Sequence, residues 1–356
     1  SYTEFVDKCG KIVVSKEALL TNIREVRRIL GNKKICLMVK ANAYGHGVER
    51  IYNLIHNNVD FFGVSNVNEA EQLYSLNKNL KILIVGKTKN FKSCAEHGFS
   101  FIVEGREHFE KLLEFLKKNP SSASCIKIHL KVNCGMNRLG ITSPKEFREI
   151  YRKALDLGIF IEGIAAHFST ADSDNRIFDL QNKKLEEFIA QIPKRQKPII
   201  SVGGSGIVFQ KLLGKQINFD MARLGLVLYG YGPRQLNLKP ALSVVSHLIK
   251  VYDVSKGEYV GYGKGFLAER DMKVGIVPLG YGDGISRGLS NKFSVWIGGK
   301  RARSIGYICM DMFFVNLTGI DAKEGDEVVV FKDAKKWAQV LGTIEYEVLT
   351  NLALIR

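Results

Sequence analysis

Several short apolar runs in the first two-thirds of the chain end beside side chains that can bind an anion or an aldehyde. Lys40 follows the first run, in VKANAYGHG, and His167 ends the sixth, in GIAAHFSTAD. The other members of this set are Lys131 and Arg138 in LKVNCGMNRLG, the loop Gly203-Gly204-Ser205-Gly206, and Arg223 with Gly225. Together these groups suit an anionic, aromatic cofactor that carries an aldehyde.

Lys40 is the strongest candidate for covalent chemistry. Its stem would pack beside an apolar run, and the partly desolvated amine that results favours Schiff-base formation. The alternative is an ordinary lysine at a strand end whose amine extends into water. The neighbouring Asn42, Tyr44 and glycines at 45 and 47 favour the chemical role.

The glycine-rich loop Gly203–Gly206 has two interpretations. Its backbone N–H groups could approach a phosphate closely, with the Ser205 hydroxyl as a further donor. Alternatively it is a simple turn. Gly225, two residues after Arg223, could supply a second group of backbone donors.

The elements that would position these residues repeat one theme, in which an apolar run is followed by a polar loop and a helical period. In Glu107–Lys118, for example, Phe109, Leu112, Leu113 and Leu116 share one face. Eight such units predict a (β/α)8 barrel, whose active site lies at the C-terminal ends of the strands. An open doubly wound sheet is the alternative, but no G-x-G-x-x-G follows the first run. The expected strands are Ile35–Val39, Phe61–Val64, Ile82–Val85, Phe101–Val103, Ile126–Val132, Ile159–Ala166, Ile199–Val202 and Met221–Leu224.

The pattern changes after about Gly232, where short alternating strands are separated by glycine-containing turns. We expect a barrel domain over residues 11–232 and a mostly-β domain over 233–356, with residues 1–10 packing with the latter. Examples of the expected strands of this second domain are Val244–Val251, Glu258–Val260, Val274–Val277, Phe293–Ile297 and Glu327–Phe331.

Composition narrows the functional class. Of the 356 residues 46% are hydrophobic and 25% charged, as in a soluble globular protein. Neither a membrane span nor a signal peptide is expected. The six scattered cysteines argue against a zinc site or a disulfide framework and favour the cytoplasm. The net charge of +16 is spread over helical faces with interspersed acids, so nucleic-acid binding is not expected.

The motif VKANAYGHG resembles the cofactor-lysine motif of the alanine racemases, which use pyridoxal phosphate. Further segments resemble that family in the family order, so the resemblance covers nearly the whole chain: LKVNCGMNRLG, AAHFSTAD, ARLGLVLYG, LKPALSVVS, VGYGKGF, PLGYGDG, GYICMDM and LGTIEYEVLTN. The resemblance implies a barrel plus a β domain, and a cytoplasmic homodimer with shared active sites. It further implies interconversion of L- and D-alanine, which supplies D-alanine for peptidoglycan.

The resemblance also implies roles for individual residues. Lys40 would hold the cofactor and act as one base, and Tyr262 would be the second base. Arg223 would face the pyridine nitrogen, oriented by His167, and Arg138 would contact the cofactor's phenolic oxygen and the substrate. The phosphate would be bound by Tyr44, Ser205, Gly225 and Leu226. Tyr281 and Met310 of a partner subunit would narrow the substrate pocket, and Lys131 matches a lysine that is carbamylated in some members.

The sequence departs from the family pattern at positions that affect phosphate anchoring and the entry channel. Gly204 stands where many relatives have Asn. Many relatives also have a phosphate-binding Tyr near the C-terminus, and the nearest position in this sequence is Leu354. Asn133 replaces a common Asp, and Tyr307 a common Arg. Without the resemblance, Tyr262 and Tyr281 would be ordinary strand tyrosines with a solvated hydroxyl. His167 would be an ordinary core histidine, and Met310 an ordinary core residue.

Three rival functions remain. A decarboxylase of similar architecture would need a carboxylate at the pyridine nitrogen, where this chain offers Arg223, a permanently charged donor. A non-enzymatic pyridoxal-phosphate carrier would resemble the barrel alone, and the β domain expected after residue 232 argues against it. A broad-specificity racemase stays open because the width of the substrate pocket is not readable from the sequence.

Overall fold

A computed structural model describes residues 9–135, 139–168, 175–204 and 206–355. The chain divides into two compact units. The barrel unit comprises residues 19–40 and 51–239. The β unit comprises the described residues up to Ala18, Ala41–Arg50, and the chain from Pro240 onward. Among the helices that are described, none is both long and apolar enough to cross a bilayer.

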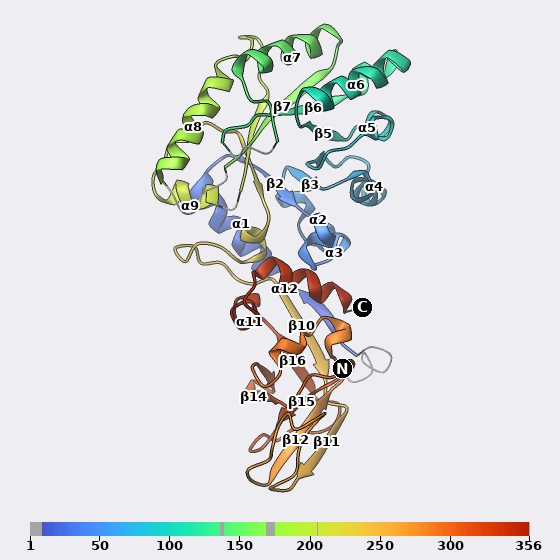
Figure 1. The fold of residues 1–356 in the computed structure, drawn as a ribbon, viewed down its shortest axis with the longest axis vertical. Coiled ribbons are helices and arrows are strands. Elements are labelled where there is room, and N and C mark those ends of the chain that lie inside the picture. The colour runs from blue at the N-terminus through green and yellow to red at the C-terminus, as the bar shows by residue number, and fades with distance from the viewer. Residues whose placement is uncertain (1–8, 136–138, 169–174, 205, 356) are drawn as a thin grey trace. The chain divides into compact units, whose positions relative to one another are not determined.

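The barrel unit contains a closed parallel barrel whose eight strands follow one another in chain order, as the sequence predicts. Most residues of these strands are buried on both faces of the sheet, so most of the strands are apolar runs rather than alternating patterns. Figure 1 shows helices around the outside of these strands. The barrel strands are β2 (Lys34–Met38), β3 (Phe61–Val64), β4 (Ile82–Ile84), β5 (Ser100–Val103), β6 (Lys127–Lys131), β7 (Phe160–His167), β8 (Ile199–Gly203) and β9 (Met221–Leu224).

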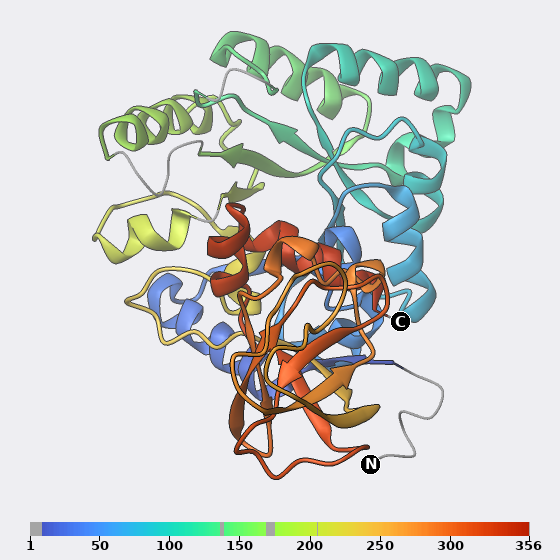
Figure 2. The same cartoon turned by 60° about the horizontal axis from the view of Figure 1, so that its bottom comes forward.

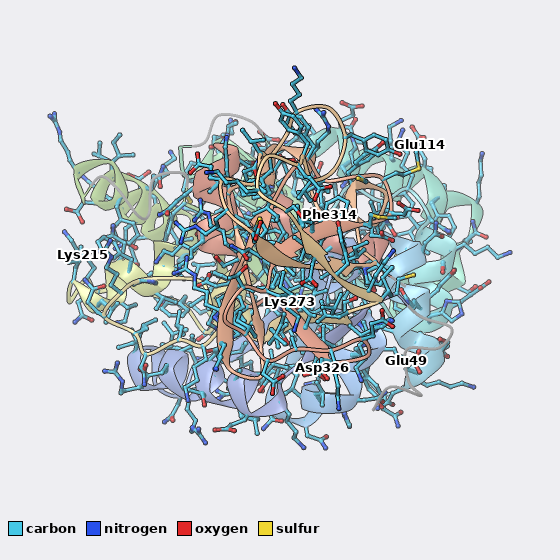
Figure 3. The ribbon with its side chains drawn as sticks, turned by 90° about the horizontal axis from the view of Figure 1, so that it is seen from below. Glu49, Glu114, Lys215, Lys273, Phe314 and Asp326 are labelled. Carbon is cyan, nitrogen blue, oxygen red and sulfur yellow. The ribbon has the colours of Figure 1, made fainter. Side chains whose placement is uncertain are left out.

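The helices between the strands are amphipathic and bury one face. In α6 (Arg106–Lys118), Phe109, Leu112 and Leu116 are buried, while Glu114 extends outward (Figure 3). The other helices of this region are α1 (Lys16–Leu30), α3 (Val48–Ile55), α4 (Val67–Leu76), α5 (Phe91–His97), α7 (Pro144–Asp156), α8 (Asn175–Ile189), α9 (Gly206–Leu212) and α10 (Leu226–Tyr229). Helices α1 and α3 each continue from residues of the β unit into the barrel unit.

The β unit is built on an eight-stranded sheet in the order β1-β10-β16-β13-β14-β15-β12-β11. Figure 2 shows it with the C-terminal helices α11 (Ala334–Leu341) and α12 (Glu345–Asn351) together at one end. Its strands are β1 (Lys11–Val14), β10 (Leu242–His247), β11 (Lys250–Val254), β12 (Met272–Val277), β13 (Ser294–Ile297), β14 (Lys300–Ile305), β15 (Phe313–Asn316) and β16 (Glu327–Phe331).

Two of the expected strands in this unit are wrong. The run Val244–Val251 is divided between β10 and β11, because the chain turns at Leu248 and Ile249 to pair with different neighbours. Glu258–Val260 is not a strand, and only Tyr259 forms an isolated bridge, to Leu267. Strands β1, β14 and β15 are not among the examples that the sequence analysis names.

Candidate active site

Three predicted site residues lie side by side on neighbouring barrel strands. His167, the last residue of β7, is in register with Gly203 at the end of β8, and Gly203 is in register with Arg223 in β9. Adjacent parallel residues in register face the same side of a sheet. The barrel therefore places an imidazole, a glycine and a guanidinium in one row near the C-terminal ends of its strands.

The guanidinium of Arg223 is buried and held by two hydrogen bonds. One NH2 group donates to the Ser201 hydroxyl at 2.5 Å and the other to the Ala166 carbonyl at 2.8 Å. Burial lowers the pKa of Arg223 to about 10, so the group remains charged at neutral pH. A fixed, charged donor at this position can face an acceptor such as a ring nitrogen.

Gly203 has a role that the sequence did not reveal. A Cβ on Gly203 would lie 2.6 Å from a guanidinium nitrogen of Arg223, so only glycine leaves room for that side chain. Ser201, which the sequence analysis missed, lies two residues earlier and so shares this face of β8. That spacing was the one available signal for its contact with Arg223.

Lys40 follows the end of β2, as predicted, but its side chain is exposed rather than partly desolvated. It comes directly after the buried Val39, which itself follows the last residue of β2, where the chain leaves the sheet. The strand end before it is fixed, because the Tyr229 hydroxyl donates to the Met38 carbonyl at 2.8 Å and the Val39 amide to the Gly63 carbonyl at 2.9 Å. The amine of Lys40 therefore projects from an anchored backbone.

The residues after Lys40 form a turn of left-handed helix, α2 (Lys40–Tyr44). Ala41, Asn42, Ala43 and Tyr44 have φ values of 52°, 53°, 55° and 53°. Each such residue costs roughly 1–2 kcal/mol for an L-amino acid, so the turn needs support from its surroundings.

Local hydrogen bonds supply part of that support. The buried imidazole of His46 donates from Nδ1 to the carbonyls of Ala43 and Tyr44, at 3.0 and 3.1 Å. The Asn42 side chain accepts from the Val48 amide at 3.0 Å, and the Asn42 carbonyl accepts from the Gly47 amide at 2.9 Å. The turn is thus tied to the start of α3.

Tyr44 lies buried in the β unit, 5.4 Å from the ring of Tyr346 in α12. Gly45 follows it at a φ of 82°, and a Cβ there would lie 2.2 Å from the Leu349 carbonyl of the same helix. The segment after the cofactor lysine candidate therefore packs directly against α12.

The predicted phosphate donors lie after β8 and β9. Gly204 has a φ of 111°, and a Cβ there would contact the Phe168 carbonyl at 3.2 Å. Gly225 precedes α10, and Leu226 is its first residue, where helix amides have no partner within the helix. Arg138 and Ser205 lie outside the described residues. Lys131, at the end of β6, is half-buried.

One segment of the β unit, residues 307–310, carries Met310 and contacts the backbone on either side, near Tyr262 and at Tyr281. Tyr307 packs beside Gly263 and Gly265 of the Tyr262 loop, while the Cys309 carbonyl accepts from the Tyr281 amide at 3.0 Å. The side chains of Tyr262, Tyr281 and Met310 are 74%, 44% and 62% exposed. This region of the β unit therefore presents two tyrosines and a methionine at its surface.

Comparisons with known proteins match the chain along most of its length. Residues 14–233 match the family model "Alanine racemase, N-terminal domain", and residues 241–354 match "Alanine racemase, C-terminal domain". The curated alanine racemase 1 of Clostridium acetobutylicum is 33% identical, over 93% of this chain and 90% of that protein.

Solved structures agree with the sequence comparisons. The alanine racemase of Clostridium difficile superposes with a TM-score of 0.86 at 28% identity, covering 97% of this chain and 93% of that one. A Bartonella henselae alanine racemase with covalently bound pyridoxal phosphate gives a TM-score of 0.82 at 26% identity, over 96% and 97% of the two chains.

Proposed function

The chain belongs to the alanine racemase family and is a pyridoxal-phosphate-dependent isomerase that interconverts L- and D-alanine, and we propose that Lys40 and Tyr262 are its two bases. Racemisation requires removal of the Cα proton from one face and delivery of a proton to the other. Two bases on opposite faces achieve this with little movement of the substrate. When bound, the cofactor supplies an electron sink that lowers the cost of the carbanion.

The observation that best supports this proposal is the geometry of Arg223. The residues present fit the cofactor, because the buried guanidinium is oriented by Ser201 and the Ala166 carbonyl and can donate to the ring nitrogen. Arginine does not release its proton at neutral pH, so it would keep that nitrogen unprotonated. Delocalisation into the ring would then be weaker, and rapid reprotonation by a nearby base would be favoured over transamination.

The exposed amine of Lys40 supports its role in holding the aldehyde of the cofactor. His167, in register with Gly203, would lie beside Arg223 and help to orient the site. Backbone donors at Gly225 and Leu226, with Tyr44 and Ser205, would hold the phosphate. Arg138 would contact the phenolic oxygen and the substrate, and Lys131 is the candidate for carbamylation.

We further propose a homodimer in which each active site combines the barrel of one chain with the β unit of its partner. The support is the exposure of Tyr262, Tyr281 and Met310 in a chain that needs a second base. In the dimer Tyr262 would act as that base, while Tyr281 and Met310 would narrow the pocket to the methyl group of alanine. This arrangement would also exclude water from the reacting centre.

The biological role that we propose is the supply of D-alanine for cell-wall peptidoglycan in the cytoplasm. The six cysteines are free thiols, which supports a reducing compartment. A broad-specificity racemase is the remaining alternative, and it differs only in the range of side chains that the pocket admits.

Two measurements test the proposal. Borohydride reduction of the holoenzyme followed by peptide mapping should label Lys40, and a label on another lysine would refute its role. A racemase assay across amino acids of increasing side-chain size should give the highest kcat/KM for alanine. Comparable values for larger amino acids would instead favour the broad-specificity alternative.

A further inference from the structure

A separate hollow of about 390 Å³ lies within the β unit, between its sheet and α11. Its floor and walls are aromatic. Phe293 and Phe331 pack edge-on against Trp337, and their ring centroids lie 5.4 and 4.9 Å from that of Trp337, respectively. Trp296 of β13 also lines the hollow. Hollows that bind small ligands have volumes of roughly 300–1,000 Å³ and mostly apolar linings.

The rim of this hollow is strongly basic. Lys292, Arg301, Lys332 and Lys336 line it, and within the described part of the chain none of the four forms a salt bridge. Asp333 is the single acid among the described lining residues, and its carboxylate accepts a hydrogen bond from the Lys335 amide at 2.9 Å. The hollow therefore presents an excess of positive charge around an aromatic floor.

The fold fixes where these charges sit. Arg301 is the cross-strand partner of Trp296, so both side chains stand on the same face of the sheet. Lys332 follows β16, and its ammonium lies 4.1 Å from the centre of the Trp296 ring. Lys336 and Trp337 are consecutive residues of α11, which lies beside β16 in Figure 1.

A second hollow that also borders Trp296 helps to define the ligand. It shares Trp296 and Lys332 with the first, but its lining includes Asp321, Asp326 and Glu327. These carboxylates would repel an anion there. This difference in charge favours binding of a negatively charged ligand in the first hollow, which Trp337 and Lys336 line.

We propose that the hollow between the sheet and α11 binds an aromatic phosphate monoester. The flat ring would lie against Trp337 and the exposed part of Val340, while the phosphate would be bound by Lys332, Lys336 and Arg301. Aromatic surface favours a planar ring, and several cations around one hollow favour a dianion. Two sources share this chemistry, namely purine mononucleotides and free vitamin B6 phosphates.

The chain offers a direct probe, because its two tryptophans both line this hollow. Holoenzyme saturated with cofactor and then desalted is titrated with AMP or with pyridoxine 5'-phosphate, which has no aldehyde. Tryptophan emission is excited at the red edge of its absorption, and free N-acetyltryptophanamide corrects for absorption by the ligand. We expect a saturable change, and the tighter ligand identifies the source.

Adenosine and inorganic phosphate are the matched ligand controls. Adenosine has the aromatic ring but no phosphate, and inorganic phosphate has the charge but no ring. Both should bind at least roughly tenfold more weakly than the aromatic phosphate. If either control binds as tightly, or if neither aromatic phosphate gives a saturable change in the millimolar range, the proposal is overturned.

Variants locate the site. Lys332→Gln should weaken binding about tenfold through the loss of a charge-assisted contact. Lys335→Gln removes an exposed charge three residues further along, in α11, that is not part of the lining, and should leave binding unchanged. In Trp337→Phe, Trp296 alone should still report the titration. Equal weakening in the Lys332 and Lys335 variants, with circular dichroism confirming that both are folded, would place the ligand elsewhere.

Discussion

The Nδ1 atom of His46 lies 3.1 Å from the carbonyl oxygen of Tyr44, and its hydrogen is donated to that oxygen and to the Ala43 carbonyl. Because carbonyls only accept, Nδ1 must carry the hydrogen. This buried imidazole therefore stabilises the left-handed turn that follows Lys40, a backbone conformation that four non-glycine residues adopt at a cost.

His46→Gln should weaken cofactor binding about tenfold, because the lost hydrogen bonds would let the Lys40–Tyr44 turn relax. The measurement is cofactor occupancy in equilibrium dialysis. His56→Gln is the matched control, since His56 also lies within hydrogen-bond distance of a carbonyl, that of Tyr52, at 2.8 Å. If both variants keep full occupancy, His46 is not needed for the turn.

His46 should also make stability depend on pH. Burial lowers the pKa of His46 from 6.5 to about 4, so the folded state keeps the ring neutral while the unfolded chain binds a proton. The contribution is present above pH 6.5 and is lost as the pH falls towards 4, by up to roughly 3 kcal/mol. Urea unfolding of wild type and His46→Gln at a series of pH values should show a smaller loss in the variant. Parallel curves would contradict this.

Gly45 and Gly31 offer a matched test of packing against α12. Both have positive φ values, 82° and 68°, but a Cβ on Gly45 would lie 2.2 Å from the Leu349 carbonyl, whereas one on Gly31 would meet nothing within 4 Å. Gly31→Ala should cost only backbone strain, about 1 kcal/mol, and Gly45→Ala roughly 3–5 kcal/mol. The test is the free energy of unfolding of the two variants. Equal losses of stability would mean that α12 moves aside for the new methyl group without a free-energy cost.

The barrel could be predicted because its strands are buried on both faces and stand out as apolar runs, such as Ile35–Val39 for β2. Strand β14, KRARSI, has no such run, since exposed Lys300, Arg301 and Arg303 dominate it. It is held by the turn at Gly298-Gly299, whose φ values of 56° and 79° suit a tight hairpin. A pattern of hydrophobicity alone cannot detect a strand of this kind.

The local conformation of the site was beyond sequence patterns for a different reason. Ala41-Asn42-Ala43 contains the best right-handed helix former, alanine, yet it folds left-handed because the rest of the fold imposes it. Contacts such as Ser201 with Arg223 join residues 22 positions apart, and only the register of β8 and β9 brings them together. Residue types predicted the chemistry of the site, and tertiary packing determined its geometry.

Arg223→Glu should change the outcome of the reaction. A glutamate at the pyridine nitrogen would favour its protonation and stronger delocalisation, so racemisation should slow by at least roughly tenfold while transamination rises. Pyruvate formation from alanine, measured beside the racemase rate, reports both. Arg223→Lys keeps a positive charge and serves as the control for packing. A glutamate variant that binds cofactor, racemises at the parent rate and forms no extra pyruvate would mean that Arg223 does not face the nitrogen.

Complementation tests the shared active site. Lys40→Ala removes the barrel base and Tyr262→Phe the β-unit base, so each variant alone should be inactive. After subunit exchange, half of the dimers should be heterodimers with one intact site, which restores up to roughly a quarter of wild-type activity. A mixture of Lys40→Ala with Arg223→Glu is the control, because both changes lie in the barrel unit and no heterodimer then has an intact barrel. Exchange is verified by mass spectrometry of differently tagged chains. If heterodimers form but the Lys40→Ala and Tyr262→Phe mixture stays inactive, then Tyr262 serves the barrel of its own chain and the shared-site proposal fails.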